Sequence, residues 1–108
     1  MEKHVVLSSF EPTILKALRT AHDTIRLGVL DDHPQKALKL KLAAKIEAYS
    51  YHPNFRRLSL ENVHQLHHAK LKIFPYTANT PSEFSLLRSL EVDGIITNEV
   101  EKLQAFLA

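Results

Sequence analysis

Short apolar runs rich in β-branched residues recur along the chain and predict β-strands. They occupy residues 4–7, 25–30, 48–51, 71–74 and 94–97. Their starts lie roughly 23 residues apart, which is about the length of a strand, a covering helix and two short loops. This alternation predicts a parallel sheet, because parallel strands are joined by crossover connections that are usually helical.

Apolar residues at helical spacing lie between the predicted strands. Pro12 suits the first turn of a helix that carries Leu15 and Leu18, since proline needs no N–H group there. Ser59 is expected to begin another helix. Residues 37–46 alternate in part like a strand, but their length and their content of Ala, Leu and Lys favour a helix.

Two further helix starts are marked by capping residues. Thr80 and Glu83 predict a capping box, in which the side chain of each residue accepts a hydrogen bond from the backbone N–H of the other. Asn98 and Glu101 offer the same geometry with asparagine as the cap. Both caps closely follow predicted strands, so we expect short loops at the carboxyl ends of these strands.

Two α/β architectures fit this order of elements. One is a small flavodoxin-like, doubly wound sheet, which has this size and number of elements. The other is part of a TIM (β/α)8 barrel, which normally needs about 250 residues, so that this chain amounts to roughly its second half. In both, functional groups gather at the carboxyl ends of the strands. We expect a single domain over residues 1–108, without a linker, and a partial domain if the chain belongs to a barrel.

Composition and charge narrow the classes of function. The chain has 14 Lys and Arg against 12 Asp and Glu, with the two signs interspersed, which argues against a nucleic-acid partner. It has no cysteine, which excludes disulfides and thiolate metal sites. Neither a targeting signal nor a membrane span is visible. A cytoplasmic location is therefore expected, although a signal could lie in a missing N-terminal part.

The predicted strand ends are polar or aromatic but poor in catalytic groups. Asp31 and Asp32 are adjacent and should point in opposite directions, which favours ordinary loop acids or helix caps over joint metal ligation. His64 and His68 stand four apart on a predicted helix, but no third metal ligand is evident. For His52 a functional role and a structural role are equally favoured. We therefore expect neither a catalytic residue nor a metal site in this chain.

Three segments after or within predicted strands carry a more specific signal. They are Val5-Val6-Leu7-Ser8-Ser9-Phe10, Phe74-Pro75-Tyr76-Thr77-Ala78-Asn79 and Val92-Asp93-Gly94-Ile95-Ile96-Thr97-Asn98. In order and spacing they resemble the C-terminal half of glycerophosphodiester phosphodiesterases. That family typically reads Ser-Ser-Phe, Trp-Thr-x-Asn and Asp-Gly-Ile-Ile-Thr-Asp at these places, and the match covers nearly the whole chain.

The resemblance implies a TIM-type barrel and metal-dependent hydrolysis of glycerophosphodiesters to an alcohol and glycerol 3-phosphate. The family's histidines and the ligands of its divalent cation, Mg²⁺ or Ca²⁺, belong to motifs upstream of the matching part. The chain is therefore expected to be inactive alone. Phe10 and Tyr76 correspond to aromatic residues that border the glycerol moiety of the substrate. Tyr76 stands where the family usually has Trp, which keeps an aromatic face and adds a hydroxyl group.

The alternative hypothesis is a binding or assembly module. A halved barrel leaves strand edges unpaired and apolar faces partly bare, which favours association with another copy or with a separate N-terminal half. Either partner would complete a barrel, and a glycerophosphodiester would bind only to the completed one.

The resemblance also draws attention to three helix-to-strand joints that usually carry glycine in the family. Here they read Glu47, Lys70 and Glu91. A left-handed helix end costs on the order of 1 kcal/mol at each residue that is not glycine, unless the helix ends in another way.

Overall fold

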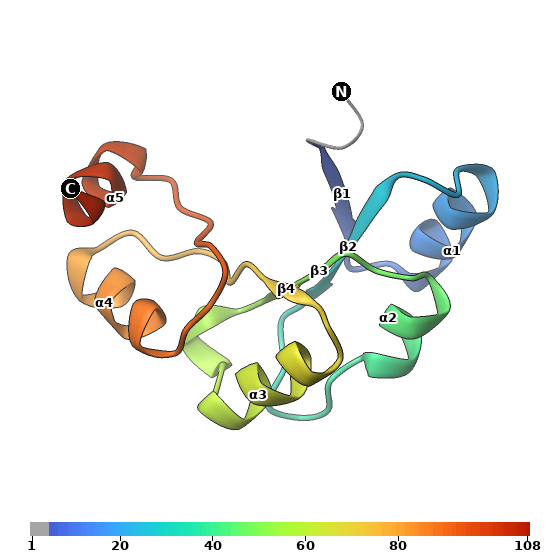
Figure 1. Cartoon of the computed structure of the whole chain (residues 1–108), viewed down its shortest axis with the longest axis horizontal. Helices are drawn as coiled ribbons and strands as arrows, with labels where there is room; N and C mark the ends of the chain where they lie inside the picture. Colours follow the sequence, from blue (N-terminus) through green and yellow to red (C-terminus); the bar gives the residue numbers. More distant parts are fainter. Residues whose placement is uncertain (1–4) are drawn as a thin grey trace.

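The computed structural model describes residues 5–108 and contains a four-stranded parallel sheet in the order β1-β2-β3-β4 (Figure 1). The strands are β1 (Val6–Ser9), β2 (Arg26–Asp31), β3 (Ser50–Pro53) and β4 (Lys72–Ile73). The helices are α1 (Pro12–Ala21), α2 (Leu40–Lys45), the 3-10 helix η2 (Phe55–Arg57), α3 (Leu60–His68), α4 (Pro81–Ser89) and α5 (Val100–Leu107). The predicted start of the first strand at residue 4 lies outside the described residues.

The arrangement of the elements distinguishes the doubly wound sheet from the partial barrel. A doubly wound sheet reverses its strand order at a switch point and carries helices on both faces. Here the strands follow the chain order without reversal, and the helices follow an arc along one side of the sheet (Figure 1). The parallel α/β repeat is therefore confirmed as part of a barrel, and the flavodoxin-like alternative is wrong.

The main core lies between the sheet and the helices on its outer side. Leu27 and Val29 of β2 alternate with residues of the inner face and pack with Tyr51, Ile73 and Leu15, all of them buried. A second cluster lies under α4 and α5 and contains Phe55, Ala78, Phe84 and Leu87. The opposite, concave side of the sheet carries no helix of the described residues (Figure 1).

Both glycines make room for aromatic rings. A Cβ atom on Gly28 would lie 2.5 Å from Nε2 of His52, and one on Gly94 would lie 2.8 Å from the ring of Phe74. The two rings are themselves in edge contact, with centroids 5.6 Å apart. Glycine is needed at these positions for close packing rather than for a turn.

The strand predicted at residues 94–97 does not form, although its residues suit a strand. The N–H of Ile73, which would start the ladder, donates instead to the carboxylate of Asp93 at 2.8 Å. The next residue with the same orientation, Pro75, has no N–H group. The segment still runs beside β4, because the N–H of Ile96 donates to the carbonyl of Pro75 at 3.0 Å.

Two helix boundaries also differ from the prediction. The helix expected over residues 37–46 is limited to Leu40–Lys45, because the N–H of Lys39 donates to the Tyr51 hydroxyl at 2.8 Å. Asn98 does not cap α5; the residue at that position is Glu99, without a side-chain cap. The N–H of Asn98 donates to the Asn79 side chain instead. Both changes come from contacts between residues that are distant in the sequence.

The other predicted helix starts are confirmed. Pro12 opens α1, and Thr80 and Glu83 form the expected capping box at the start of α4. Ser59 caps α3, where Asn62 completes a second capping box. These caps satisfy backbone N–H groups that have no partner within a helix.

Three helices end in left-handed residues that are not glycine. Glu47, Lys70 and Glu91 have φ angles of 50°, 63° and 62°. After α2 the N–H of Glu47 donates to Ala44 and that of Ala48 to Ala43, which is the Schellman pattern. The equivalent bonds form after α3. The joints therefore adopt the left-handed geometry in spite of its cost.

None of the helices among the described residues has both the length and the apolar character needed to cross a membrane.

Candidate functional site

The carboxyl ends of the strands bring Phe10 and Tyr76 together. Phe10 follows β1, whereas Tyr76 follows β4, and their rings meet edge to face with centroids 6.1 Å apart and planes at 84°. The backbone of Tyr76 is tied to the segment after β3, since its N–H donates to Pro53 and its carbonyl accepts from Phe55. The peptide bond between Tyr76 and Thr77 is cis. The two aromatic residues predicted to border a substrate thus share one surface, and their binding role stays a prediction.

Asp32 lies at the centre of a polar cluster beneath this aromatic pair. The Tyr76 hydroxyl donates to Oδ1 of Asp32 at 3.0 Å, and the Asn54 side-chain amide donates to the same oxygen at 2.8 Å. The guanidinium of Arg57 lies 3.6 Å from Oδ2 of Asp32 and donates to its backbone carbonyl at 3.2 Å. We call Asp32, Asn54, Arg57 and Tyr76 the Asp32 cluster. It joins the ends of β2, β3 and β4.

Hydrogen bonds and burial shift the pKa values of two members of the Asp32 cluster, Asp32 and Tyr76. The bonds from Asn54 and then from Tyr76 lower the pKa of the Asp32 carboxyl group, with smaller contributions from His33 and Arg57. Burial and the Asp32 carboxylate raise the pKa of Tyr76 to about 12. At neutral pH Tyr76 is therefore a hydrogen-bond donor and Asp32 an ionised acceptor.

Asp31 points away from this cluster, as the alternation along the strand predicts. Its Oδ2 accepts from the Tyr51 hydroxyl at 2.5 Å on the helix side of the sheet, and its Oδ1 accepts from the N–H of His33. Burial and then this bond raise the pKa of Tyr51. Neither Asp31 nor Asp32 caps a helix, so that part of the prediction is wrong.

His52 takes a buried position on the inner face. Its Nε2 lies 2.7 Å from the Ser50 hydroxyl, while its Nδ1 has no hydrogen-bond partner among the described residues. Burial lowers its pKa to about 4, so the ring is neutral at neutral pH. This geometry favours the structural role over the functional one.

The histidines and carboxylates of the described residues do not gather into a group of three or more that could hold a metal ion. His64 and His68 are exposed on α3. The Nε2–H of the neighbouring His67 donates to Oδ2 of Asp93 at 2.8 Å, which ties α3 to the segment after α4.

The Asp32 cluster contains residues that the sequence did not single out, although a signal was present. Asp32, Asn54 and Tyr76 stand 22 residues apart, and the strand register pairs Gly28 with Ser50 and Ser50 with Lys72 at the same interval. Residues at this interval occupy one level of the sheet and one face. The repeat length alone could have grouped the three side chains.

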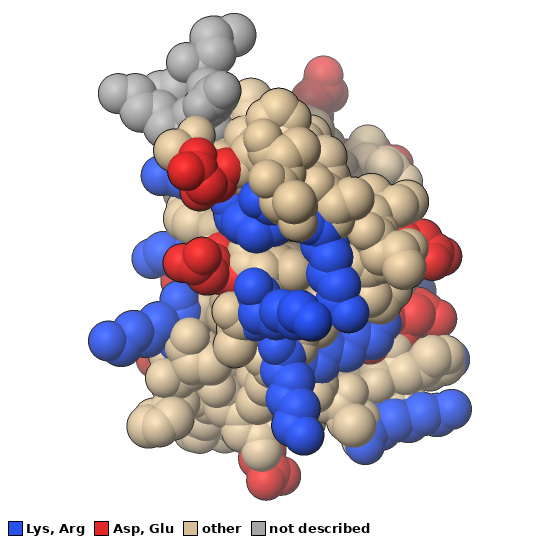
Figure 2. Space-filling model, turned by 90° about the vertical axis from the view of Figure 1, so that its right-hand side faces the viewer, with Lys and Arg blue, Asp and Glu red and all other residues tan. Residues whose placement is uncertain are grey.

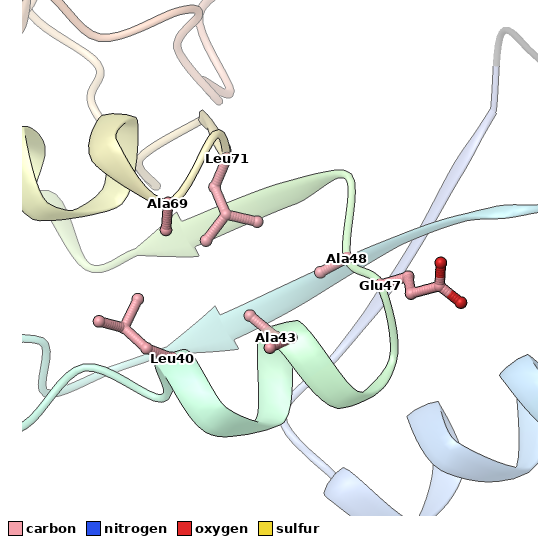
Figure 3. A pocket seen from close by; sticks show the side chains of 7 residues that line it. Leu40, Ala43, Glu47, Ala48, Ala69 and Leu71 are labelled. Carbon is pink, nitrogen blue, oxygen red and sulfur yellow. The ribbon is translucent and has the colours of Figure 1, made fainter.

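A pocket of about 170 Å³ lies elsewhere, between α2 and α3 (Figure 3). Leucine and alanine side chains dominate its lining, and the Glu47 carboxylate points away from it (Figure 3). It lies beside the residues that precede β3 and β4, at the opposite ends of these strands from Tyr76, and Glu47 is the one lining residue with a charged side chain. We regard it as a packing gap beside the shortened α2.

Comparison with protein families matches residues 1–102 to the glycerophosphoryl diester phosphodiesterase family. A curated glycerophosphodiester phosphodiesterase of Caldanaerobacter subterraneus subsp. tengcongensis is 30% identical over an alignment of 104 residues, and the match covers 94% of this chain and 42% of that protein.

Solved structures of similar fold point the same way. A glycerophosphoryl diester phosphodiesterase from Silicibacter pomeroyi, described as putative, superposes with a TM-score of 0.88 and 23% identity, over 99% of this chain and 39% of that chain. A phosphodiesterase from Oleispira antarctica, in complex with the product sn-glycerol 3-phosphate, superposes with a TM-score of 0.86 and 18% identity, over 94% of this chain and 41% of that chain. A glycerophosphodiester phosphodiesterase from Thermotoga maritima superposes with a TM-score of 0.74 and 26% identity, over 98% of this chain and 48% of that chain. The chain thus spans less than half the length of each of these relatives.

Proposed function

The chain belongs to the glycerophosphoryl diester phosphodiesterase family, and we propose that it supplies the substrate side of an enzyme that hydrolyses glycerophosphodiesters to an alcohol and glycerol 3-phosphate. The observation that carries this proposal is the meeting of Phe10 and Tyr76 at the carboxyl edge of a partial barrel. In barrels of this type the active site lies at that edge. The product bound in the Oleispira relative supports glycerol 3-phosphate as the product here.

Each group at this edge has a defined part in binding. The exposed ring of Phe10 offers an apolar face to the carbon atoms of glycerol, and Tyr76 closes the same surface from the other side. The Asp32 carboxylate holds the Tyr76 hydroxyl at 3.0 Å and so fixes the orientation of the ring. The chain thereby positions a substrate before any bond is broken.

The divalent cation of the family does not fit the residues described here. The Asp31 carboxylate accepts from Tyr51, and the Asp32 carboxylate accepts from Asn54 and Tyr76 beside the charge of Arg57. Neither is disposed to bind a hard cation, which takes oxygen ligands from several groups at once. We propose that the cation and the acid and base groups come from a preceding half of the barrel, and that this chain alone is inactive.

The direct test is complementation with glycerophosphocholine as substrate and Mg²⁺ or Ca²⁺ present. The chain alone should give no hydrolysis above buffer, whereas a fusion behind the N-terminal half of the Caldanaerobacter relative should hydrolyse the substrate, and EDTA should stop it. Hydrolysis by the chain alone would contradict its expected inactivity. A folded fusion that hydrolyses none of several glycerophosphodiesters would contradict the proposed function.

A matched pair of variants in the active fusion tests the binding surface. Phe10→Ala removes a ring that is 46% exposed. The lost apolar contact with the substrate is worth roughly 1.5 kcal/mol, so KM should rise about tenfold. Leu60→Ala removes an equally exposed side chain, 49%, from α3 and should leave KM unchanged. Equal effects of the two variants would remove Phe10 from the site.

A second candidate function, assembly, is favoured by apolar side chains exposed at both ends of the arc. Val5, Leu7 and Ile14 are 47%, 43% and 50% exposed beside β1, the free edge of the sheet. At the other end Val100 and Leu107 are 56% and 60% exposed on α5. We propose that another copy or a separate N-terminal half covers these surfaces and completes the barrel.

Light scattering after size exclusion tests the assembly proposal. A dimer or larger complex of the chain is expected at micromolar concentration, or a one-to-one complex when an N-terminal half is added. Leu7→Asp should dissociate it, whereas Leu60→Asp, at a similarly exposed position away from both ends, should not. A monomer that also fails to bind any N-terminal half would refute assembly without bearing on the fold.

A further inference from the structure

Positive charge is concentrated on one side of the molecule. Residues 12–46 contain seven Lys and Arg but only three Asp and no Glu, and neither α1 nor α2 contains an acidic residue. Figure 2 shows this side, where Lys and Arg gather over the surface that includes α1 and α2; some acidic side chains lie among them and others lie at the margins. The small net charge of the whole chain conceals this separation.

Five lysines make up this surface, which we call the lysine face. They are Lys16 on α1, Lys36 and Lys39 before α2, and Lys41 and Lys45 on α2. Among the described residues none of them has a carboxylate within ion-pair distance. Lys41 and Lys45 stand four apart on one helix, an arrangement in which like charges repel each other.

The arginines of this side are bound within the fold. The Arg19 guanidinium donates to the carbonyls of Ile46, His22 and Ile25 and thereby joins α1 to the end of α2. The Arg26 guanidinium lies over the ring of Tyr49, 4.3 Å from its centre. The charges that reach outward are therefore those of lysines, on two helices that are fixed side by side.

This chemistry fits an anionic lipid surface better than a nucleic acid. Lysine is a flexible point charge, and adsorption to anionic headgroups requires several such charges on one side of a protein but no shaped groove. Nucleic-acid binding commonly adds bidentate arginines or aromatic side chains that stack on bases, and the lysine face has neither.

We propose that the lysine face docks the protein on an anionic phospholipid bilayer. The helices concerned lie on the outer side of the sheet, so the face stays available when the concave side is covered (Figure 1). Each lysine near such a surface strengthens binding about fivefold, and five act together.

The test is co-sedimentation of the full chain with sucrose-loaded vesicles. Vesicles of phosphatidylcholine with about one third phosphatidylglycerol should bind the protein at about 0.1 M NaCl, and vesicles of pure phosphatidylcholine should not. Binding should be lost at about 1 M NaCl, because the screening length falls from about 10 Å to about 3 Å. Equal binding to both vesicles, or binding that salt does not weaken, would overturn the proposal.

Two triple variants with the same change in net charge locate the surface. Replacing Lys36, Lys41 and Lys45 by Gln should weaken binding about 100-fold, at roughly fivefold for each lysine. The control variant combines Lys70→Gln, Lys72→Gln and Lys102→Gln, three lysines outside the lysine face. It should weaken binding much less. Glutamine keeps helix propensity, and circular dichroism checks that both variants are folded.

The outcomes decide between the sources of binding. A control variant that loses binding as strongly as the face variant would show an effect of total charge and overturn the docking surface. Tighter binding of the chain to a duplex DNA or RNA oligonucleotide than to the anionic vesicles would assign the face to nucleic acid instead. Because no hydrolysis is measured, these results are independent of the proposed enzymatic function.

Discussion

Replacing the three left-handed helix ends by glycine is expected to stabilise the protein. Glu47, Lys70 and Glu91 have φ angles between 50° and 63°, and their exposed side chains make no hydrogen bond or ion pair among the described residues. The left-handed conformation costs an L-residue about 1–2 kcal/mol, because its Cβ crowds the following carbonyl group. Glycine removes this cost but adds about 0.4–1 kcal/mol of backbone freedom to the unfolded chain.

The net gain is therefore about 0.5–1 kcal/mol at each site. The three sites follow the different helices α2, α3 and α4, so the gains should add to roughly 2 kcal/mol in the triple variant. For a domain of this size that corresponds to an increase in Tm of about 10 °C. Urea denaturation followed by far-ultraviolet circular dichroism measures the gain in free energy of unfolding, and a thermal melt measures Tm.

Two controls separate this effect from the loss of a side chain. Glu47→Ala removes the same carboxylate but keeps the Cβ, and its stability should change by less than about 0.5 kcal/mol. Lys41→Gly places glycine inside α2 and should destabilise the protein by about 1 kcal/mol. If Glu47→Gly is no more stable than Glu47→Ala, the left-handed geometry is not the source of the cost and the reasoning is refuted.

Three further predictions follow from the site and the inner face. Burial lowers the pKa of His52 from 6.5 to about 4, so between these pH values the unfolded chain binds a proton at His52 and the folded chain does not. The free energy of unfolding should therefore fall by up to about 3 kcal/mol as the pH falls from 6.5 to 4. In urea denaturation, His52→Gln should abolish this dependence of the midpoint on pH. Asp32→Asn should lower the pKa of Tyr76 from about 12 toward 10 in an ultraviolet tyrosinate titration, and a shift of the same size in the surface control Asp23→Asn would contradict the contact. Gly28→Ala should lower the free energy of unfolding by about 1–3 kcal/mol, because the new Cβ would lie 2.5 Å from the buried His52 ring. This cost should largely vanish in a His52→Ala background, and an unchanged cost there would refute the contact.

Local signals in the sequence predicted much of the fold. The capping boxes and the recurrent apolar runs depend on neighbouring residues, so Thr80 and Glu83 could be placed without the structure. The strand at residues 94–97 failed for a reason outside it, since the adjoining Pro75 has no N–H to donate. The start of α2 moved because Lys39 donates to Tyr51.

The candidate site was predicted in part for the same reason. Phe10 and Tyr76 were found through their resemblance to a family pattern, and the structure places them in contact. Asp32 looked like an ordinary loop acid, because its partners Asn54 and Tyr76 stand on other strands. The interval of 22 residues between them was a signal in the sequence, but the strand register that gives this interval its meaning depends on packing across the sheet.

The sequential order of the strands has a consequence for how the molecule comes apart. The most extensively packed pairs are successive strands and helices that adjoin in the chain, such as α1 with β1, α3 with β4 and α4 with α5. Stability in such an array is close to a sum over units and their interfaces, as in repeat proteins. Opening should therefore begin at the ends, and amide exchange should slow from α5 toward β2 and β3 in the middle. A preceding βα unit would extend the same series and turn the free edge at β1 into one more interior interface.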